Sequence, residues 1–372
     1  MRITAIETQA IQPRWLIVKV HTDEGITGYG EPTLEGHVPA VMAEIGQWRA
    51  ELLGKDPRQI QHHWQGLYRH GFYRGGPIQC SALSGLEQAM WDIVGKWLGV
   101  PVWALLGGKV RDRIRMYRHV GGETPEALAE GGRQAVALGF TAVKTTVVEA
   151  GVRHIDSSAV VAAAEERMAS LRQAVGPTVD IGIDLHGRVS PAMAIRLAKA
   201  LEPYQPMFLE EPCLPENVEA MASIARATSI PVATGERLLT KWQFRPLLEV
   251  GAAAILQPDP SHAGGILETR FIAAMAEASF AAIAPHCPLG PVALAACLQL
   301  DACTPNFLIQ EHVTLGEGYL KQPFAIEDGY LRVPDAPGLG IELDEEYLGE
   351  MADAGAWLNP RCYCEDGSVA DW

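Results

Sequence analysis

The sequence predicts an α/β protein, built as a TIM-like (β/α) barrel that follows an N-terminal α+β unit. From Arg113 onward, short apolar runs alternate with segments of helical periodicity. Several of these runs end in polar residues about 25 residues apart, the length that one βα unit with short loops needs. The first hundred residues read instead as alternating strands followed by helices. The 372 residues suffice for both domains.

The N-terminal unit is predicted from two kinds of pattern. Residues 1–30 alternate like two or three antiparallel strands with a turn at 23–25, and residues 38–105 are helical with breaks at 56–57 and 75–77. The predicted domains are residues 1–112, a barrel over 113–320, and a C-terminal segment over 321–372 that returns to the first domain.

Eight parallel strands are predicted for the barrel. The 40-residue interval after Lys144 leaves room for a longer loop and a helix within residues 154–176. Residues 338–346 are expected to form one further strand that returns to the N-terminal unit. The eight candidate strand ends are Val120, Lys144, Asp184, Glu210, Glu236, Asp259, His286 and Glu311.

The composition excludes several classes of protein. A net charge of −15 argues against a nucleic-acid partner. Because the sequence has neither an apolar run of membrane-spanning length nor the apolar core of a signal peptide, we expect a cytoplasmic protein without a membrane partner. The seven cysteines are expected to remain thiols. Cys362 and Cys364 could bind a metal, but two incidental cysteines are the favoured interpretation.

Three carboxylates form the strongest signal in the chain. Asp184, Glu210 and Glu236 follow one another at intervals of 26 residues, each after a short apolar run. In consecutive βα units they would converge at the carboxyl mouth of the barrel, where such enzymes place their active sites. Three oxygen ligands suit a hard cation such as Mg²⁺. In the alternative interpretation each acid caps the next helix.

Two histidines accompany this set. His186 lies two residues after Asp184, so strand alternation would point both into the mouth, where His186 can act as ligand, acid or base. Glu210 is favoured as ligand over Glu211, which is expected to point to the opposite face. Asp259 would fix the tautomer of His286 and make it a general base.

Glu311 faces the same mouth, where it could hold a substrate hydroxyl or carboxylate. His262 is expected mainly to line a loop, with substrate contact as the less favoured alternative. Together these groups suit removal of a proton next to a carboxylate, because a cation stabilises the enediolate charge that develops. An acid and a base then permit loss of a β-hydroxyl as water, with racemisation as the competing outcome.

Long segments carry a family resemblance. They include SGLEQAMWDIVGKWLGVPVWALLGG at 84–108, DLHGRVS at 184–190, LEPYQPMFLEEP at 201–212 and APHCPLGPVALAAC at 284–297. The chain resembles the mandelate racemase subgroup of the enolase superfamily over nearly its whole length, and most closely the D-galactonate dehydratases within it.

The resemblance implies a modified (β/α)7β barrel under a capping domain that the C-terminal segment completes. It implies dehydration of an acid sugar, with D-galactonate as first candidate, to a 2-keto-3-deoxy acid, and a homo-oligomer, either dimer or octamer. The implied roles are Mg²⁺ binding for Asp184, Glu210 and Glu236, C2 proton abstraction for His286 with Asp259, protonation of the leaving 3-hydroxyl for His186, enediolate or carboxylate contact for Glu311, and substrate contact for Arg14, Trp15, Glu31, His37, Lys144, Thr146 and His262.

Thr146 departs from the family pattern. Racemases of the subgroup resemble Lys-x-Lys here, whereas this chain has Lys144-Thr145-Thr146, which favours dehydration with one base. D-galactonate dehydratases carry Asn at the position of Thr146, and a Thr reaches less far and forms fewer hydrogen bonds. Another aldonate, or a racemase or epimerase reaction, therefore stays open. A non-catalytic metal- or ligand-binding homologue is the least favoured alternative.

Overall fold

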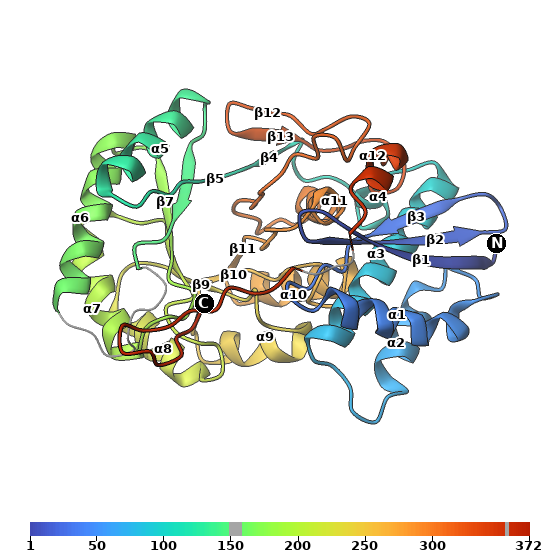
Figure 1. Cartoon of the computed structure of the whole chain (residues 1–372), viewed down its shortest axis with the longest axis horizontal. Coiled ribbons are helices and arrows are strands. Elements are labelled where there is room, and N and C mark those ends of the chain that lie inside the picture. The colour runs from blue at the N-terminus through green and yellow to red at the C-terminus, as the bar shows by residue number, and fades with distance from the viewer. Residues whose placement is uncertain (149–157, 354–356) are drawn as a thin grey trace.

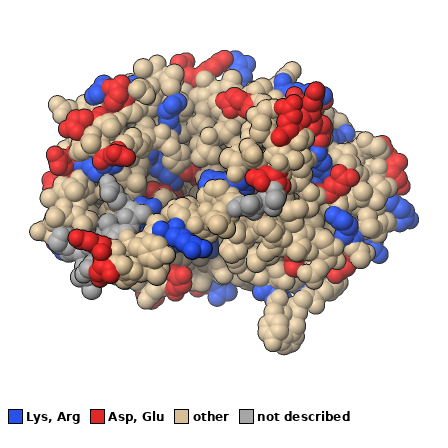
Figure 2. Space-filling view, viewed as in Figure 1, with Lys and Arg blue, Asp and Glu red and all other residues tan. Residues whose placement is uncertain are grey.

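The computed structural model describes residues 1–148, 158–353 and 357–372. It has two parts that lie side by side, a barrel with its outer helices and a smaller capping domain that contains the N-terminus (Figure 1). Lys and Arg are interspersed with Asp and Glu over the face drawn in Figure 2. On this face the described residues therefore form no continuous basic surface of the kind that nucleic acids require.

The capping domain packs helices against a three-stranded antiparallel sheet of order β1-β2-β3. Both predicted helix breaks are confirmed, because separate helices begin at Ile60 and at Pro77. The elements are β1 (Ile3–Ile11), β2 (Trp15–Thr22), β3 (Thr27–Gly30), α1 (Val38–Leu52), α2 (Ile60–Arg69), α3 (Pro77–Leu98) and α4 (Val102–Leu105).

Helix α3 is the central element of this domain. It begins with Pro77 in its first turn and ends at Gly99, whose φ of 69° is the left-handed conformation that closes many helices. Its residues are buried on nearly every side, because it packs on β2 and β3, on α1 and α2, and on α10 of the barrel. The helix therefore joins the two domains.

The barrel contains a seven-stranded parallel sheet in sequence order. It is closed by the isolated parallel bridges Met116–Gln310 and Ile283–Phe307, so the fold class is confirmed and the eighth position is an irregular segment. The strands are β5 (Arg118–His119), β6 (Ala142–Thr145), β7 (Asp180–Asp184), β8 (Phe208–Glu210), β9 (Val232–Thr234), β10 (Ile255–Leu256) and β11 (Ala282–Ile283).

The outer helices follow their strands as the alternation predicts. Thr124, Ser190 and Asn217 begin α5, α7 and α8, and each accepts a hydrogen bond from a backbone N–H of the first turn. The helix predicted within residues 154–176 is α6, and its first positions, 154–157, lie outside the described residues. The helices are α5 (Pro125–Ala137), α6 (Ser158–Val175), α7 (Pro191–Leu201), the 3₁₀ turn η1 (Glu202–Tyr204), α8 (Val218–Ala227), α9 (Thr240–Glu249), α10 (Ile266–Ala278) and α11 (Pro291–Ala302).

Several strands end earlier than predicted. β9 ends before Gly235, whose φ is 147°, and β10 and β11 end before Pro258 and Pro285. Gly235 leaves the extended conformation and proline lacks the N–H that continues a ladder, so pairing stops at these points. The polar residues assigned to the strand ends consequently lie on the loops that follow.

The C-terminal segment divides between the two domains. Strands β12 (Ile326–Glu327), β13 (Tyr330–Arg332) and β4 (Arg113–Arg115) form a three-stranded antiparallel sheet. Its central strand β13 pairs with both neighbours, and β4 precedes the barrel sheet. The chain then returns to the capping domain, where the Leu339 N–H donates to Asp92 Oδ1 at 2.8 Å, and continues into α12 (Glu345–Glu350). The strand predicted over 338–346 is wrong, because left-handed Gly338 and Gly340 interrupt the extended backbone.

Glu31 joins the domains as a helix cap. Its Oε1 accepts the Gly290 N–H at 2.6 Å, and its Oε2 accepts those of Val292 and Ala293 at 3.1 and 3.0 Å. These groups form the N-terminus of α11, which favours a carboxylate. Burial nevertheless raises the pKa of Glu31 to about 7. This fully buried carboxylate is occupied by the barrel helix, and substrate contact by Glu31 stays a prediction.

Trp15 is also a packing residue. Its side chain is almost fully buried and belongs to the apolar cluster that joins β1 and β2 to α11 and the C-terminal segment. Its ring meets that of Tyr319 edge-on, with 4.8 Å between centroids. Trp15 therefore helps to dock the domains, and its contact with substrate stays a prediction.

Two composition-based expectations concern the whole chain. No helix in the described ranges combines the length and the apolar character needed to cross a membrane. All seven cysteines are free, as expected, and Cys362 and Cys364 lie half-exposed in the C-terminal tail.

Replacing Glu31 should destabilise the docked domains. Glu31→Ala leaves three buried N–H groups of α11 without their acceptor, so we expect the free energy of unfolding to fall by roughly 2–4 kcal/mol in urea titrations followed by circular dichroism. Glu24→Ala, at a partly exposed position in the same domain, is the control and should change little. Equal unfolding midpoints for the two variants would contradict the cap.

Candidate active site at the barrel mouth

Three carboxylates converge where β7, β8 and β9 end. Asp184 is opposite Glu210 in the register of β7 and β8, and Glu236 follows β9 by two residues. One oxygen from each lies within 4.8 Å of the others. The convergence predicted from their spacing is therefore present.

The set fits a hard divalent cation. Glu210 is fully buried, and its Oε2 has no hydrogen-bond partner among the described residues. Burial, together with the neighbouring charge of Asp184, raises the pKa of Glu210 well above its ordinary value. A cation among the three carboxylates would relieve this repulsion and supply the missing partner, and an all-oxygen donor set is the kind that Mg²⁺ and similar ions take.

Lys144 provides a fixed positive charge beside the three carboxylates. Its Nζ lies 2.7 Å from Glu210 Oε1, 3.0 Å from Glu311 Oε1 and 3.3 Å from Asp184 Oδ2. Although burial alone would lower it, the pKa of Lys144 is raised well above its ordinary value by Glu210 and Glu311. Burial would raise the pKa of Asp184, but Lys144 and His186 favour its charged form. The pKa of Asp184 is therefore lowered. Lys144 therefore stays charged at the floor of the mouth.

Asp259 and His286 form the pair that the sequence predicts. His286 Nδ1 lies 2.8 Å from Asp259 Oδ2, which places the Nδ1 proton toward the carboxylate. His286 Nε2 then faces the mouth, 3.7 Å from Glu236 Oε2 and 3.9 Å from Glu311 Oε2. Burial alone would lower the pKa of His286, but Glu236, Glu311 and Asp259 raise it well above its ordinary value.

His186 reaches the mouth by a turn rather than by strand alternation. β7 ends at Asp184, and His186 has a φ of 50°. Its backbone N–H donates to Asp184 Oδ1 at 2.9 Å, its Nε2 lies 3.1 Å from Asp184 Oδ2, and its carbonyl accepts from Arg237 Nη2 at 2.6 Å. The predicted neighbourhood is present, but the turn and Arg237 create it.

Glu211 does not point away from the site. Its carboxylate lies 2.8 Å from Arg237 Nε, and its φ of 41° turns it out of strand alternation. Burial raises the pKa of Glu211 well above its ordinary value, and the charges of Glu236 and Asp184 add to this effect. It is a buried neighbour of the three carboxylates, although its oxygens are not among the convergent set.

Glu311 contacts groups of several neighbouring strands and loops. Its Oε1 lies 2.9 Å from His119 Nε2 and its Oε2 accepts the Cys287 N–H at 2.8 Å. Burial would raise the pKa of Glu311, but Lys144, His286 and His119 hold it well below its ordinary value. The sequence interpretation missed His119 because it ended the first barrel strand at Val120. A strand end at His119 would have included it.

The other residues that are predicted to contact substrate differ in burial and in their contacts. Arg14 donates to the Pro288 carbonyl at 3.0 Å, pairs with Glu35 at 2.8 Å and stacks on Trp357, so it lies where capping loops meet the loop that carries His286. His37 is exposed at the start of α1. Thr146, half-buried after β6, donates to the Val148 carbonyl at 2.9 Å. His262 is buried, and its ring contacts the capping domain through Ser81.

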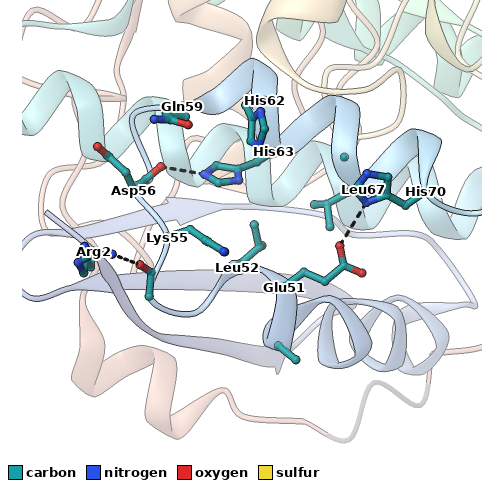
Figure 3. A pocket seen from close by; sticks show the side chains of 13 residues that line it. Arg2, Glu51, Leu52, Lys55, Asp56, Gln59, His62, His63, Leu67 and His70 are labelled. Carbon is teal, nitrogen blue, oxygen red and sulfur yellow. Dashed lines mark hydrogen bonds and ion pairs between the residues drawn. The ribbon is translucent and has the colours of Figure 1, made fainter.

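A separate hollow of about 640 Å³ lies within the capping domain (Figure 3). Several of the polar side chains that line it contact other groups of the capping domain. Arg2 donates to the Gly54 carbonyl at 2.7 Å, and His63 Nε2 lies 2.8 Å from the Asp56 carbonyl oxygen. The convergent acids and histidines of the described residues lie at the barrel mouth instead, and that is the candidate active site.

The fold and these residues define the class of protein. Residues 2–107 match the mandelate racemase/muconate lactonizing enzyme N-terminal domain, and residues 127–347 match the enolase C-terminal domain-like family. The chain belongs to the mandelate racemase subgroup of the enolase superfamily.

Its relatives include curated and structurally solved proteins. D-galactonate dehydratases of Ralstonia nicotianae and Ralstonia pickettii are each 49% identical to it, over 100% of both chains. The crystal structure of a mandelate racemase/muconate lactonizing enzyme from Sulfitobacter sp. has a TM-score of 0.92 and 36% identity over 100% of both chains. A corresponding enzyme from Jannaschia sp. CCS1 has a TM-score of 0.91 and 36% identity, over 98% of this chain and 100% of that one.

Loss of one convergent carboxylate should weaken metal binding. We expect Glu236→Gln to lower the affinity for Mg²⁺ by about a hundredfold or more, because the ligand charge count falls. Titration calorimetry, and Mn²⁺ paramagnetic resonance as a second probe, would measure it. Glu211→Gln removes a neighbouring buried carboxylate outside the set and should bind Mg²⁺ nearly as the wild type does. Equal affinities in both variants would refute the three-ligand assignment.

Proposed function

We propose that the protein is a Mg²⁺-dependent sugar-acid dehydratase that converts an aldonate, with D-galactonate as first candidate, into a 2-keto-3-deoxy acid. The main support for the proposal is that two histidines with different hydrogen-bond partners lie beside the carboxylates at the barrel mouth. His286 is backed by Asp259, and His186 lies beside Asp184. A base and an acid at a cation site are the groups that α-proton abstraction followed by β-elimination requires.

Asp184, Glu210 and Glu236 would hold the Mg²⁺ ion. When bound, the ion would offset the negative charge that builds on the substrate carboxylate as its neighbouring carbon loses a proton. Lys144, which contacts Glu311 at 3.0 Å, places further positive charge at the same end of the mouth. The substrate carboxylate is therefore expected to bind between the three ligands and Glu311.

His286 would take the C2 proton on Nε2. Asp259 accepts the Nδ1 proton, holds the ring in the required tautomer, and stabilises the imidazolium that forms. His186 would give a proton to the 3-hydroxyl as the C3–O bond breaks, so that water leaves. The resulting enol then becomes the 2-keto-3-deoxy acid by moving a proton to C3.

The relatives support the enzyme class, a carbon–oxygen lyase of the hydro-lyase type, because the 49% identity to D-galactonate dehydratases extends over both full chains. Lys144-Thr145-Thr146 contains a single lysine. The β6 side therefore has one base fewer than a racemase that uses two bases would have. Arg14, His37 and Thr146 are proposed to contact the distal hydroxyls. We also propose a cytoplasmic homo-oligomer, either a dimer or an octamer.

A panel of aldonates incubated with Mg²⁺ would test the reaction. We expect 2-keto acid, detected as its semicarbazone, from D-galactonate or from an aldonate that differs in configuration at C4 or C5. Treatment with a chelator should abolish turnover and added Mg²⁺ should restore it. Absence of product from every aldonate would refute the dehydratase, and exchange with inversion at C2 without product would identify an epimerase instead.

The two histidines should separate the reaction into its steps. We expect His286→Asn to abolish exchange of the C2 proton in D₂O and to lower kcat by about 10³-fold or more. His186→Asn should leave part of this exchange while it stops loss of water, because His286 remains. Nuclear magnetic resonance of the substrate would follow both events. Equal loss of exchange in the two variants would contradict these separate roles.

A further inference from the structure

The loop after β10 determines where the Asp259 carboxylate lies. Asp259 is the third residue of this loop and is almost fully buried. Its Oδ2 lies 2.8 Å from His286 Nδ1, and its Oδ1 accepts the Ser261 N–H at 2.7 Å. The backbone carbonyl of Asp259 also accepts the N–H groups of His262 and Ala263, at 2.9 and 2.7 Å. A shift of residues 260–263 would therefore move the carboxylate that orients the base.

Helix α3 of the capping domain holds this loop. Gln88 Nε2 donates to the Pro260 carbonyl at 3.1 Å and to Ser261 Oγ at 3.2 Å, while Gln88 Oε1 accepts the Glu31 N–H at 2.9 Å. The amide of Gln88 is thus fixed on both sides. Since Ser261 is the residue whose N–H binds Asp259 Oδ1, a single side chain links the capping domain to the carboxylate.

His262 provides a second link between the same elements. Its Nδ1 lies 2.8 Å from Ser81 Oγ on α3, and its Nε2 lies 3.8 Å from Asp259 Oδ2. The Ser81 hydroxyl donates to the Pro77 carbonyl at 2.6 Å, so it accepts from His262 Nδ1–H. The imidazole therefore fills the space between α3 and the carboxylate in one defined orientation.

Small and buried polar residues let the loop after β10 pack closely against α3. Ser81, Ser84 and Gln88 are fully buried and lie on one face of α3, at intervals of three and four residues. Ser84 Oγ accepts the Gly264 N–H at 3.0 Å. Gly265 has a φ of 95°, and a Cβ there would lie 2.3 Å from Glu87 Oε2, so a larger residue would push the loop off the helix.

We propose that α3 positions the catalytic base across the domain boundary, and that Gln88 and His262 are positioning residues for proton abstraction. The proposal rests on the function proposed above for His286. The acid side differs, because His186 is held by Arg237 and Asp184, both of the barrel. Disturbing α3 should therefore impair removal of the C2 proton while the groups around His186 keep their places.

The test compares Gln88→Ala and His262→Ala with Glu87→Gln. Glu87 is a matched control, because it is equally buried on the same helix but caps α10 through the Ile266 and Leu267 N–H groups. We expect the first two variants to lower kcat by about tenfold to a hundredfold with KM nearly unchanged, because the base is displaced. The isotope effect on kcat with C2-deuterated substrate should rise in both, since proton abstraction becomes slower than later steps.

His262→Asn, which can keep a donor toward Ser81, should recover part of the activity that His262→Ala loses. Glu87→Gln should lower the unfolding temperature without changing the isotope effect. The proposal is overturned if Gln88→Ala keeps wild-type kcat and isotope effect, or if Glu87→Gln loses kcat equally with no change in isotope effect.

A crystal structure of Gln88→Ala provides a measurement that does not depend on turnover. We expect the Asp259 Oδ2–His286 Nδ1 contact to lengthen beyond hydrogen-bond distance, or the carboxylate to rotate. An unchanged pair would overturn the proposal even if the protein proved to act on another substrate. Conversely, a displaced pair in a protein that turns over no aldonate would refute the dehydratase and leave the positioning intact.

Discussion

Repulsion among buried carboxylates is the constraint around which the barrel mouth is organised. Asp184, Glu210, Glu236 and Glu311 lie close together where little water can screen them, and such a group is stable only with matched positive charge. Lys144 contacts three of the four, at 2.7 to 3.3 Å. One lysine does not balance four acids, so the fold leaves a place for a divalent cation and keeps histidines beside the acids. The same deficit of positive charge would favour binding of a metal ion, and the neighbouring carboxylates raise the pKa of His286.

Carboxylates also fasten the two domains together. Glu31 and Glu87, both of the capping domain, accept backbone N–H groups at the first turns of α11 and α10. Burial raises the pKa of each to about 7, and the helix N–H groups oppose that rise. A carboxylate that caps a helix of another domain fixes both the distance and the direction of docking, because it must meet two or three donors at once. The loops after β10 and β11 lie beside these contacts, so docking and active-site geometry are set together.

Local periodicity was enough to predict the barrel, the convergent Asp184, Glu210 and Glu236, and the Asp259–His286 pair, because parallel strands bring their carboxyl ends to one mouth. It could not indicate the packing partners of Glu31 and Trp15, since these partners lie in α11 and at Tyr319, hundreds of residues away. His186 was placed correctly for the wrong reason, because a left-handed turn replaces strand alternation. The eighth strand position of the barrel is irregular, because the segment there is joined by the isolated bridges Met116–Gln310 and Ile283–Phe307. The sequence pattern before Glu311 did not indicate this irregularity.

The acid and the base depend on different parts of the molecule. His186 lies on a turn supported by Arg237 and Asp184, next to the end of β6 where Thr146 departs from the family pattern. His286 is supported by Asp259, and Asp259 by a loop that Gln88 of the capping domain holds. Substitutions on the β6 side would therefore leave the contacts that hold His286, the proposed base, in place. Under the proposed function, this separation would let the acid side change while the Asp259–His286 pair keeps its geometry.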